Sequence, residues 1–432
     1  MNNQEKGVLG ESFVYELTQK AFFSYWCFVN PKDDLGDKKE ICDILVNFKG
    51  ILLLICVKNY EFKGIYSRYF RKCIEKDVRQ LNGAQRKILN SKYDIQIQNE
   101  NGRIHILDKK EIKTVHRIIV HLGDKVHFYP FNKITKTENF VHVFDKNSFY
   151  NLINYLDTIV DFEEFLRKRE LAFSNKEVFI LPNEENSFDN KTREQFLELE
   201  SNKSWGEKTN IIISGTECDL LAHYIEHNRT YPKQITENEY NGMLIQIDGE
   251  WDNFISKEKS KIKKENDRVS YLIDDYINGN VMKNPNKDNL ELAKSLLSFN
   301  RFERRIFTKH LYDLVKKNSR IQHEDFIERK MGELNGIGII FVFYTVNASQ
   351  EFINNILPLI LDSYCVYSKY KYQKIILAAS TNNGRQFKFA VKNNITPFDV
   401  EYENLIKKEI KKQNWFKNIN ETKFSEFEFP NN

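Results

Sequence analysis

Glycine and proline are scarce in this chain of 432 residues, with 17 and 8 occurrences. So few turn formers leave little room for long flexible linkers or low-complexity spacers. Long apolar runs are also lacking, because the longest, Ile51–Val57 and Ile339–Tyr344, fall well short of the roughly 18 residues that a membrane span needs. The first residues lack the charged start, apolar core and cleavage site of a secretory signal. We therefore expect a cytoplasmic protein with no membrane partner.

A strong excess of one charge is absent as well. The 65 Lys and Arg residues against 61 Asp and Glu leave a formal net charge of +4. This balance argues against a general polycation, so any contact with nucleic acid must come from local clusters of basic residues. The six cysteines are scattered without a C-x-x-C pair, which favours reduced, buried thiols over structural zinc. The sequence also has no phosphate-binding G-x-x-x-x-G-K-[ST] loop and no G-x-S-x-G motif, so ATPase and α/β-hydrolase activities have no support.

What the sequence does contain is enough apolar material for real cores, at 41% hydrophobic and 13% aromatic residues. The pattern predicts an α/β protein: a mixed-sheet N-terminal domain at 1–170, a polar, acidic connection at 171–209, and an accessory region at 210–432. The accessory region reads as helix-rich at first and as α/β toward its end. Expected helices are Val8–Ala21, Arg68–Leu89, Asn147–Lys168, Asn289–Val315 and Ser349–Cys365. Expected strands include Ile41–Phe48, Ile51–Val57, Gly336–Thr345, Lys374–Ala379 and Gln386–Val391, the first two joined by a turn at Lys49-Gly50.

The most informative segment is KEICDILVNFKGILLLICVK, residues 39–58. Asp43 lies inside an otherwise apolar strand, and Lys58 ends the next one. Burying an unpaired carboxylate or ammonium group costs several kcal/mol as an order of magnitude. A charge in each of two adjacent strands therefore indicates that the two charges meet each other or a metal ion. Glu11, on the preceding helix, and Gln80, on the following one, complete a recognisable order of residue types.

At these residues the chain resembles the PD-(D/E)XK nuclease superfamily, and most closely its nuclease-related and Mrr-like branch. In that branch a G-x-x-G-E helix start precedes an E-x-x-D segment and a strand that ends in x-x-K-N. The matching segments are Gly7-Val8-Leu9-Gly10-Glu11, Glu40-Ile41-Cys42-Asp43 and Cys56-Val57-Lys58-Asn59. The resemblance covers roughly residues 5–90 and extends to 150 at most.

The resemblance implies a restriction-endonuclease-like domain that hydrolyses phosphodiester bonds with Mg²⁺ or Mn²⁺. Glu11 and Asp43 would hold the ion with Glu40 in reserve, Lys58 would orient or activate water, and Gln80 would support them. DNA is favoured over RNA as the substrate, in a bacterial antiviral-defence or restriction setting. That setting rests on family analogy alone. The possible protein partners are a second copy of the chain or another protein of the same system.

One residue departs from the family pattern. The second acid of the motif belongs two residues before Lys58, where this chain has Cys56. A neutral thiol is a poor ligand for Mg²⁺. Either Glu11 or Glu40 supplies the missing carboxylate, or the domain is a catalytically inactive nuclease fold that binds nucleic acid or a partner protein.

Two helices carry local excesses of basic residues. The first predicts contacts with nucleic-acid phosphates through Arg68, Arg71, Lys72, Lys76 and Arg79. The second, 301–320, contains Arg301, Arg304 and Arg305 and is explained equally well by phosphate contacts or by a solvated helix face. His223 and His227 have the i, i+4 spacing of metal ligands, but no third ligand is evident, so a metal site there is disfavoured.

Overall fold

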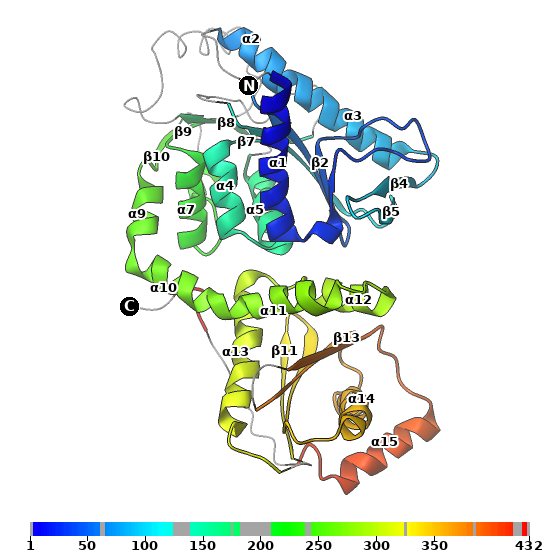
Figure 1. Cartoon of the computed structure of the whole chain (residues 1–432). Helices are drawn as coiled ribbons and strands as arrows, with labels where there is room; N and C mark the ends of the chain where they lie inside the picture. The colour runs from blue at the N-terminus through cyan, green and yellow to red at the C-terminus, as the bar shows by residue number, and fades with distance from the viewer. Residues whose placement is uncertain are drawn as a thin grey trace. The chain divides into compact units, whose positions relative to one another are not determined.

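The computed structural model is a mixed α/β protein (Figure 1), as the sequence predicts. It describes residues 3–60, 65–123, 139–173, 176–181, 209–237, 243–323, 326–382, 386–417 and 426–429. The chain divides into two compact units, Met1–Lys261 and Ile262–Asn432. No helix in these described stretches is both long and apolar enough to cross a lipid bilayer.

The first unit is built on a mixed sheet in the order β1-β2-β3-β6-β7. Its strands are β1 (Cys27–Val29), β2 (Ile44–Phe48), β3 (Ile51–Lys58), β6 (Thr114–His121) and β7 (His142–Asp145). β1, β2 and β3 are antiparallel neighbours, whereas β3, β6 and β7 run parallel. The predicted hairpin turn is confirmed, because Lys49 and Gly50 both have positive φ, at 49° and 87°, as tight two-residue hairpins require. β2 begins at Ile44, later than predicted, so Asp43 lies just before the strand.

The helices of this part of the chain mostly follow the predicted pattern. They are α1 (Asn3–Phe22), α2 (Tyr66–Phe70), the π-helical turn η2 (Arg71–Glu75), α3 (Lys76–Asn90), α4 (Lys146–Tyr155) and α5 (Ile159–Phe173). A short 3₁₀ turn, η1 (Ser24–Trp26), precedes β1, and the hairpin β4 (Ile95–Gln98) and β5 (Ile104–Leu107) follows α3. The single helix expected at Asn147–Lys168 is two helices, because Thr158 Oγ1 accepts a hydrogen bond from the Asp161 N–H at 3.0 Å and starts a new helix.

The sheet is covered on both faces. Arg117 of β6 donates to Gln85 of α3, whereas the adjacent His116 contacts Glu170 of α5. Because consecutive strand residues point to opposite faces, α3 and α5 lie on opposite sides of the sheet. Lys58 and Cys56 share the face of Arg117, since β3 pairs in register with β6. The side chain of Lys58 therefore points toward α3.

The boundary between the units does not follow the expected connection at 171–209. β8 (Lys176–Leu181) lies within that stretch and pairs in parallel with β9 (Thr209–Ser214), which in turn pairs with β10 (Met243–Gln246). Residues 182–208 of the expected connection lie outside the described residues. This three-stranded sheet belongs to the first unit, together with α7 (Glu217–Glu226), α8 (Lys233–Thr236) and α9 (Glu250–Ser256). The polar stretch thus separates two paired strands.

A buried ionic network ties α5 to the sheet and to α7. Arg169 is fully buried, and its guanidinium donates to Glu217, the first residue of α7, and to Nδ1 of His142 at 3.1 Å. The same guanidinium lies over the rings of Phe140, Phe144 and Phe173, at 4.9 to 5.6 Å from their centroids. Since Glu217 is itself buried, Arg169 compensates a carboxylate that has almost no access to water.

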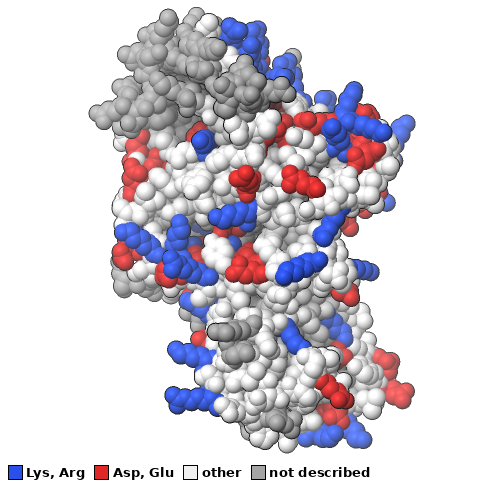
Figure 2. Space-filling view, viewed as in Figure 1, with Lys and Arg blue, Asp and Glu red and all other residues white. Residues whose placement is uncertain are grey.

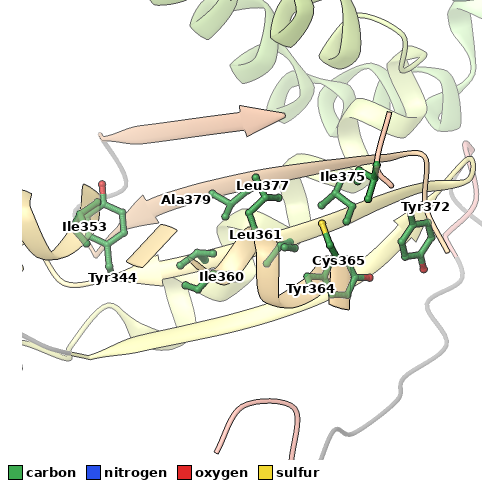
Figure 3. Packing of buried hydrophobic residues seen from close by; sticks show 13 residues of the cluster. Tyr344, Ile353, Ile360, Leu361, Tyr364, Cys365, Tyr372, Ile375, Leu377 and Ala379 are labelled. Atoms are coloured by element: carbon green, nitrogen blue, oxygen red, sulfur yellow. The ribbon is translucent and has the colours of Figure 1, made fainter. Parts of the chain in front are cut away.

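The second unit contains a sheet in the order β11-β12-β13-β14, in which only the central pair, β12 and β13, is parallel. Its strands are β11 (Ile327–Leu334), β12 (Ile337–Tyr344), β13 (Lys374–Thr381) and β14 (Phe387–Asn393). Its helices are α11 (Tyr271–Tyr276), the π-helical turn η5 (Ile277–Val281), α12 (Lys287–Leu296), α13 (Arg301–Asn318), α14 (Gln350–Tyr367) and α15 (Val400–Lys412). The units divide within α10 (Glu258–Asp267), which the 3₁₀ turn η4 (Arg268–Ser270) follows. Figure 3 shows the core that α14 makes with β12 and β13, where Ile360, Cys365 and Leu377 are buried.

The arginines of the second basic helix form ion pairs within the second unit. The long helix expected at Asn289–Val315 is divided, because Asn300 and Glu303 form a capping box that starts α13. Arg301 and Arg304 then bind the two carboxylate oxygens of Asp274, each at 2.6 Å, and all three side chains belong to the second unit. Arg305 pairs with Asp267 at 2.9 Å. These three arginines are buried and stabilise the fold, so they do not form a phosphate-binding surface.

We predict that replacing Arg169 by Met lowers the free energy of unfolding of the first unit by about 3 to 5 kcal/mol, because the buried Glu217 carboxylate loses the cation that pairs with it. Urea denaturation of the full chain measures this change. Arg86→Met is the matched control, because Arg86 is exposed on α3, and it is expected to change the stability by less than about 0.5 kcal/mol. Equal effects of the two substitutions would contradict the role given to Arg169.

Candidate functional site

Lys58 and Asp77 form an ion pair at the end of β3. Lys58 Nζ lies 3.1 Å from Oδ1 of Asp77, and the two side chains are 28% and 1% exposed. Asp77 belongs to the first turn of α3 and faces the sheet. Its second oxygen, Oδ2, has no hydrogen-bond partner among the described residues. One carboxylate oxygen in a nearly dry position therefore remains unused.

Asp43 lies next to β3, just before β2 begins. Its Oδ2 accepts a hydrogen bond from the Val57 N–H at 2.5 Å. Burial, together with the negative charges of Glu11, Asp77 and Glu40, raises the pKa of Asp43 from its ordinary value of 3.8 to about 7, although the hydrogen bond from Val57 opposes the shift. The region around Asp43 thus carries more negative charge than the nearby basic side chains neutralise. A bound cation would reduce this excess negative charge.

α1 brings Glu11 toward this end of the sheet. Glu11 is half-buried, and its Oε2 accepts a long hydrogen bond of 3.5 Å from Asn30. The preceding residue, Gly10, allows the close approach, because a Cβ there would lie 2.8 Å from Leu122 Cδ1 and 3.6 Å from Asn59 Cβ. The second glycine of the G-x-x-G-E segment therefore has a packing reason, whereas a Cβ at Gly7 would meet nothing within 4 Å.

The electrostatics of the site determine which charge Lys58 carries. Burial opposes its protonation, but Asp77 and then Asp43 raise the pKa of Lys58 above its ordinary value. Lys58 is therefore a cation in the metal-free protein. His121, its neighbour in β6, is fully buried, and burial followed by the charge of Lys58 lowers the pKa of His121 to about 4. The imidazole thus stays neutral beside the ammonium group.

The structure brings some of the predicted site residues together and not others. Asp43, just before β2, is hydrogen-bonded to Val57 beside Lys58 of β3, and Glu11 and Glu40 influence Asp43 electrostatically. Glu40 is exposed. Gln80 is half-buried on α3, one turn after Asp77, and makes no hydrogen bond with a described residue. Asp77 makes the contact with Lys58 that the order of residue types predicted for Gln80.

The sequence contains a signal for Asp77 that the motif pattern passes over. Ile74, Val78 and Leu81 mark the apolar face of the helix, and Asp77 stands in the same stripe. A charge on an apolar helix face needs a partner for the same reason as a charge in a strand. The π-helical turn η2 immediately before α3 is a further local irregularity of a kind that is frequent at functional sites.

Cys56 occupies the position that the family motif gives to an acid. It is buried, with 1% of its surface exposed, and burial raises the pKa of its thiol well above the ordinary value. Cys56 is therefore a neutral packing residue. The carboxylates of Asp43 and Asp77 both act on it electrostatically, as does Lys58. Asp77 thus supplies a carboxylate in the neighbourhood where Cys56 lacks one.

A row of basic side chains runs along the helix that carries Asp77. All five predicted phosphate contacts are exposed: Arg68, Arg71, Lys72, Lys76 and Arg79. No ion pair joins any of them to another described residue. Figure 2 shows Lys and Arg side chains gathered along the edge formed by α2 and α3. We call these five residues the basic ridge. Unlike the arginines of α13, they are available to an external anion.

A second cluster of possible metal ligands lies on the opposite face of the sheet. Glu170 Oε1 lies 2.8 Å from Nδ1 of His116 and 3.0 Å from Nε2 of His142, and these three groups could in principle hold a metal ion. Arg169 is a donor only, so its contact with Nδ1 of His142 places the imidazole proton on Nε2. Nε2 then donates to Glu170 and has no lone pair for a metal. The cluster is explained as a hydrogen-bonded network.

Two further metal arrangements are not assembled in the described part of the chain. The ligand atoms of His116, His142 and Glu170 all lie within 4.8 Å of one another. Among the described residues, Asp43 does not belong to a group of three possible ligands that is equally compact. His223 and His227 stack at 3.8 Å, and His223 pairs with Glu250 at 3.3 Å instead of sharing a metal with His227.

Comparisons with protein-family models, with curated proteins and with solved structures find no match to this chain. A function is therefore inferred from the residues and their geometry.

The two glycines before Glu11 give a matched test of how α1 positions that residue. Gly10→Ala is expected to be less stable than Gly7→Ala, because the side chain of Leu122 must shift to admit the new methyl group. Gly7→Ala is expected to raise the free energy of unfolding by roughly 0.5 to 1 kcal/mol, as Ala normally does in a helix interior. Urea denaturation distinguishes the two, and equal shifts would show that α1 does not approach β3 closely.

The raised pKa of Asp43 predicts how divalent cations act on stability. Because ionising Asp43 costs more in the folded than in the unfolded chain, this group lowers the free energy of unfolding as pH rises from about 4 toward about 7. A cation that binds the ionised carboxylate reverses this loss. Mg²⁺ or Mn²⁺ should therefore raise the melting temperature more at about pH 8 than at about pH 6. Asp43→Asn should abolish the difference, and an unchanged response in that variant would contradict the assignment.

Proposed function

We propose that this chain is a metal-dependent nuclease whose active site is formed by Asp43, Lys58, Glu11 and Asp77. The observation that carries the proposal is the Lys58–Asp77 pair at the end of β3, beside an Asp43 whose pKa is raised to about 7. Perturbed pKa values cluster at active sites, and here one belongs to an acid that lies beside the ion pair in the same part of the fold.

The order of elements supports the proposal. α1, β1, β2, β3, α3 and β6 follow one another, with antiparallel pairing up to β3 and a parallel strand after α3. This arrangement agrees with the restriction-endonuclease-like core that the resemblance in the sequence implies. The positions of the motif residues support the proposal as well, since Asp43 lies just before β2, Lys58 ends β3 and Glu11 lies on α1.

The residues fit a hard divalent cation. Carboxylate oxygens are the ligands that Mg²⁺ and Mn²⁺ prefer. Asp77 Oδ2 has no partner in the described structure, and the acids around Asp43 leave negative charge uncompensated. Asp43 and Glu11 would hold the ion, with Asp77 as the carboxylate that replaces the acid missing at Cys56. Glu40 is a less suitable ligand because it is exposed.

A phosphodiester bound at this site would meet groups with distinct tasks. The bound ion supplies Lewis-acid stabilisation of the phosphoryl oxygens and makes its coordinated water more acidic. Lys58, protonated because of Asp77, is suited to hold a water molecule and to stabilise negative charge as it develops on the phosphate. Asp77 orients Lys58. The basic ridge on the same helix would hold the flanking phosphates.

A catalytically inactive nuclease fold remains the alternative, and one observation favours it. Cys56 stands in place of the second acid, and the described carboxylates near Asp43 do not bring three ligand atoms together within 4.8 Å. Under this alternative the basic ridge binds nucleic acid, and Lys58 and Asp77 form a structural pair.

Cleavage of plasmid DNA and of RNA with Mg²⁺ or Mn²⁺ tests the proposal, with a chelator as control. We expect Asp43→Ala and Lys58→Ala each to reduce the rate by about 10²- to 10³-fold, as loss of a transition-state stabiliser typically does. Cys56→Ala is expected to retain activity, and Asp77→Asn to lose more than Gln80→Ala. Metal-dependent cleavage that is equal in the wild type and in Lys58→Ala would contradict the active site.

The basic ridge predicts a separable effect on nucleic-acid binding. Replacing Arg71, Lys72 and Arg79 together by Gln should weaken binding uniformly across sequences and reduce the slope of log K against log salt by about one for each phosphate that is no longer neutralised. The control replaces Lys316 and Arg320, which are exposed basic residues of the second unit. Equally weakened binding in the two variants would show that binding is not localised on α2 and α3.

A further inference from the structure

Arg329 of the second unit lacks the partner that the other buried arginines have. It lies on the edge strand β11, opposite Val342 of β12, and so points to the face that carries the core of α14. Its side chain is half-buried, and its Nη1 is inaccessible to water without a hydrogen-bond partner. Arg329 has neither a hydrogen bond nor an ion pair with any described residue.

The contacts that Arg329 does make are aromatic. Its guanidinium lies 4.2 Å from the ring centroid of Trp415 and 5.5 Å from that of Phe416. Phe416 stacks in turn on Tyr367, at 4.2 Å between centroids and 12° between planes. Tyr367 is 45% exposed. A flat cation therefore stands beside a short aromatic stack that reaches the surface.

This arrangement is costly unless an anion completes it. Desolvation of an unpaired guanidinium outweighs what ring contacts return, by the reasoning that applies to any buried charge. Burial lowers the pKa of Arg329 to about 10, and no carboxylate of the described residues opposes the shift. In the same unit Arg301 and Arg304 each bind Asp274. The unit thus pairs these structural arginines with acids, whereas Arg329 has no acidic partner among the described residues.

We propose that Arg329, Trp415 and Phe416 form an anion-binding pocket that takes a phosphate of a single-stranded nucleic-acid end. A guanidinium is a strong, permanently charged hydrogen-bond donor to phosphate oxygens. The exposed ring of Tyr367 offers a surface on which a base can stack, as aromatic side chains do in single-strand binding proteins. The exposed Lys369, Lys411 and Lys412 lie close in sequence to these rings and add positive charge.

The choice of a nucleic-acid phosphate rests on the proposed function. A nuclease that binds DNA or RNA through the basic ridge can hold a strand end through its second unit. Binding at Arg329 needs neither Lys58 nor a divalent cation, so it can be measured separately from cleavage.

The experiment measures binding of a short 5′-phosphorylated oligonucleotide to the full chain by fluorescence anisotropy, in the presence of a chelator. All proteins carry Lys58→Ala, so no cleavage occurs. Arg329→Met is expected to weaken binding by about tenfold to a hundredfold, the range for a charge-assisted contact. Removing the 5′-phosphate from the oligonucleotide should weaken its binding to the parent protein by a similar factor. It should hardly change the binding to the Arg329→Met protein. Lys287→Gln is the control, since Lys287 is exposed at the start of α12 and should bind like the parent.

Thermal unfolding separates a binding role from a structural one. Since Met fills the space without a buried charge, Arg329→Met should melt at the same temperature as the parent or higher. Inorganic phosphate should raise the melting temperature of the parent and not that of Arg329→Met. A lower melting temperature together with unchanged binding would overturn the proposal. If the protein with native Lys58 does not cleave nucleic acid but still binds it through Arg329, the proposed nuclease activity is contradicted and the anion-binding site is not.

Discussion

The opposite charges of Lys58 and Asp77 meet where the sheet and α3 exclude most of the water, and the rest of the candidate site depends on that pair. Without Asp77, burial would favour a neutral Lys58. Without Lys58, Asp77 would be a stranded carboxylate on an apolar helix face. The pair keeps Lys58 protonated, and the negative charge of Asp77 adds to the potential that raises the pKa of Asp43. A cation that binds in this region would neutralise part of the negative charge around Asp43.

The arginines of the chain divide by the partners they have. Arg169 and Arg304 are fully buried with carboxylates in direct contact, and they stabilise packing between elements. The residues of the basic ridge are exposed, and none has an ion-pair partner among the described residues. Arg329 belongs to neither class, because it is half-buried and its contacts with described residues are to aromatic rings. The small net charge of +4 therefore says little about the binding of anions. The positions of the acidic residues decide which Lys and Arg side chains remain available to an external anion.

The elements that sequence reasoning found are those with strong local signals. The β2–β3 hairpin follows from two apolar runs and from a Lys-Gly turn that requires positive φ. Asp43 and Lys58 were found because a charge in an apolar strand is anomalous on its own. Asp77 was missed because, in a helix with seven basic residues, one acid reads as part of a solvated face. Its place in the apolar stripe with Val78 and Leu81 was the available signal, and the packing of α3 against β3 shows that it points inward.

Other features could not be read from local patterns. The three-stranded sheet of β8, β9 and β10 joins strands separated by polar sequence, so composition suggested a domain connection where the chain pairs two neighbouring strands. The sequence left open whether the arginines of α13 face solvent, because their partners, Asp267 and Asp274, lie 27 to 38 residues earlier in the chain. Side-chain pairing across such separations is decided by tertiary structure.

A crystal structure of the protein grown with Mn²⁺, with the ion located by its anomalous scattering, would test the proposed active site without reference to activity. We expect Mn²⁺ on Asp43, with Glu11 or Asp77 as a further carboxylate ligand and Lys58 alongside. Mn²⁺ bound at His116, His142 and Glu170 with none at Asp43 would contradict the proposed site.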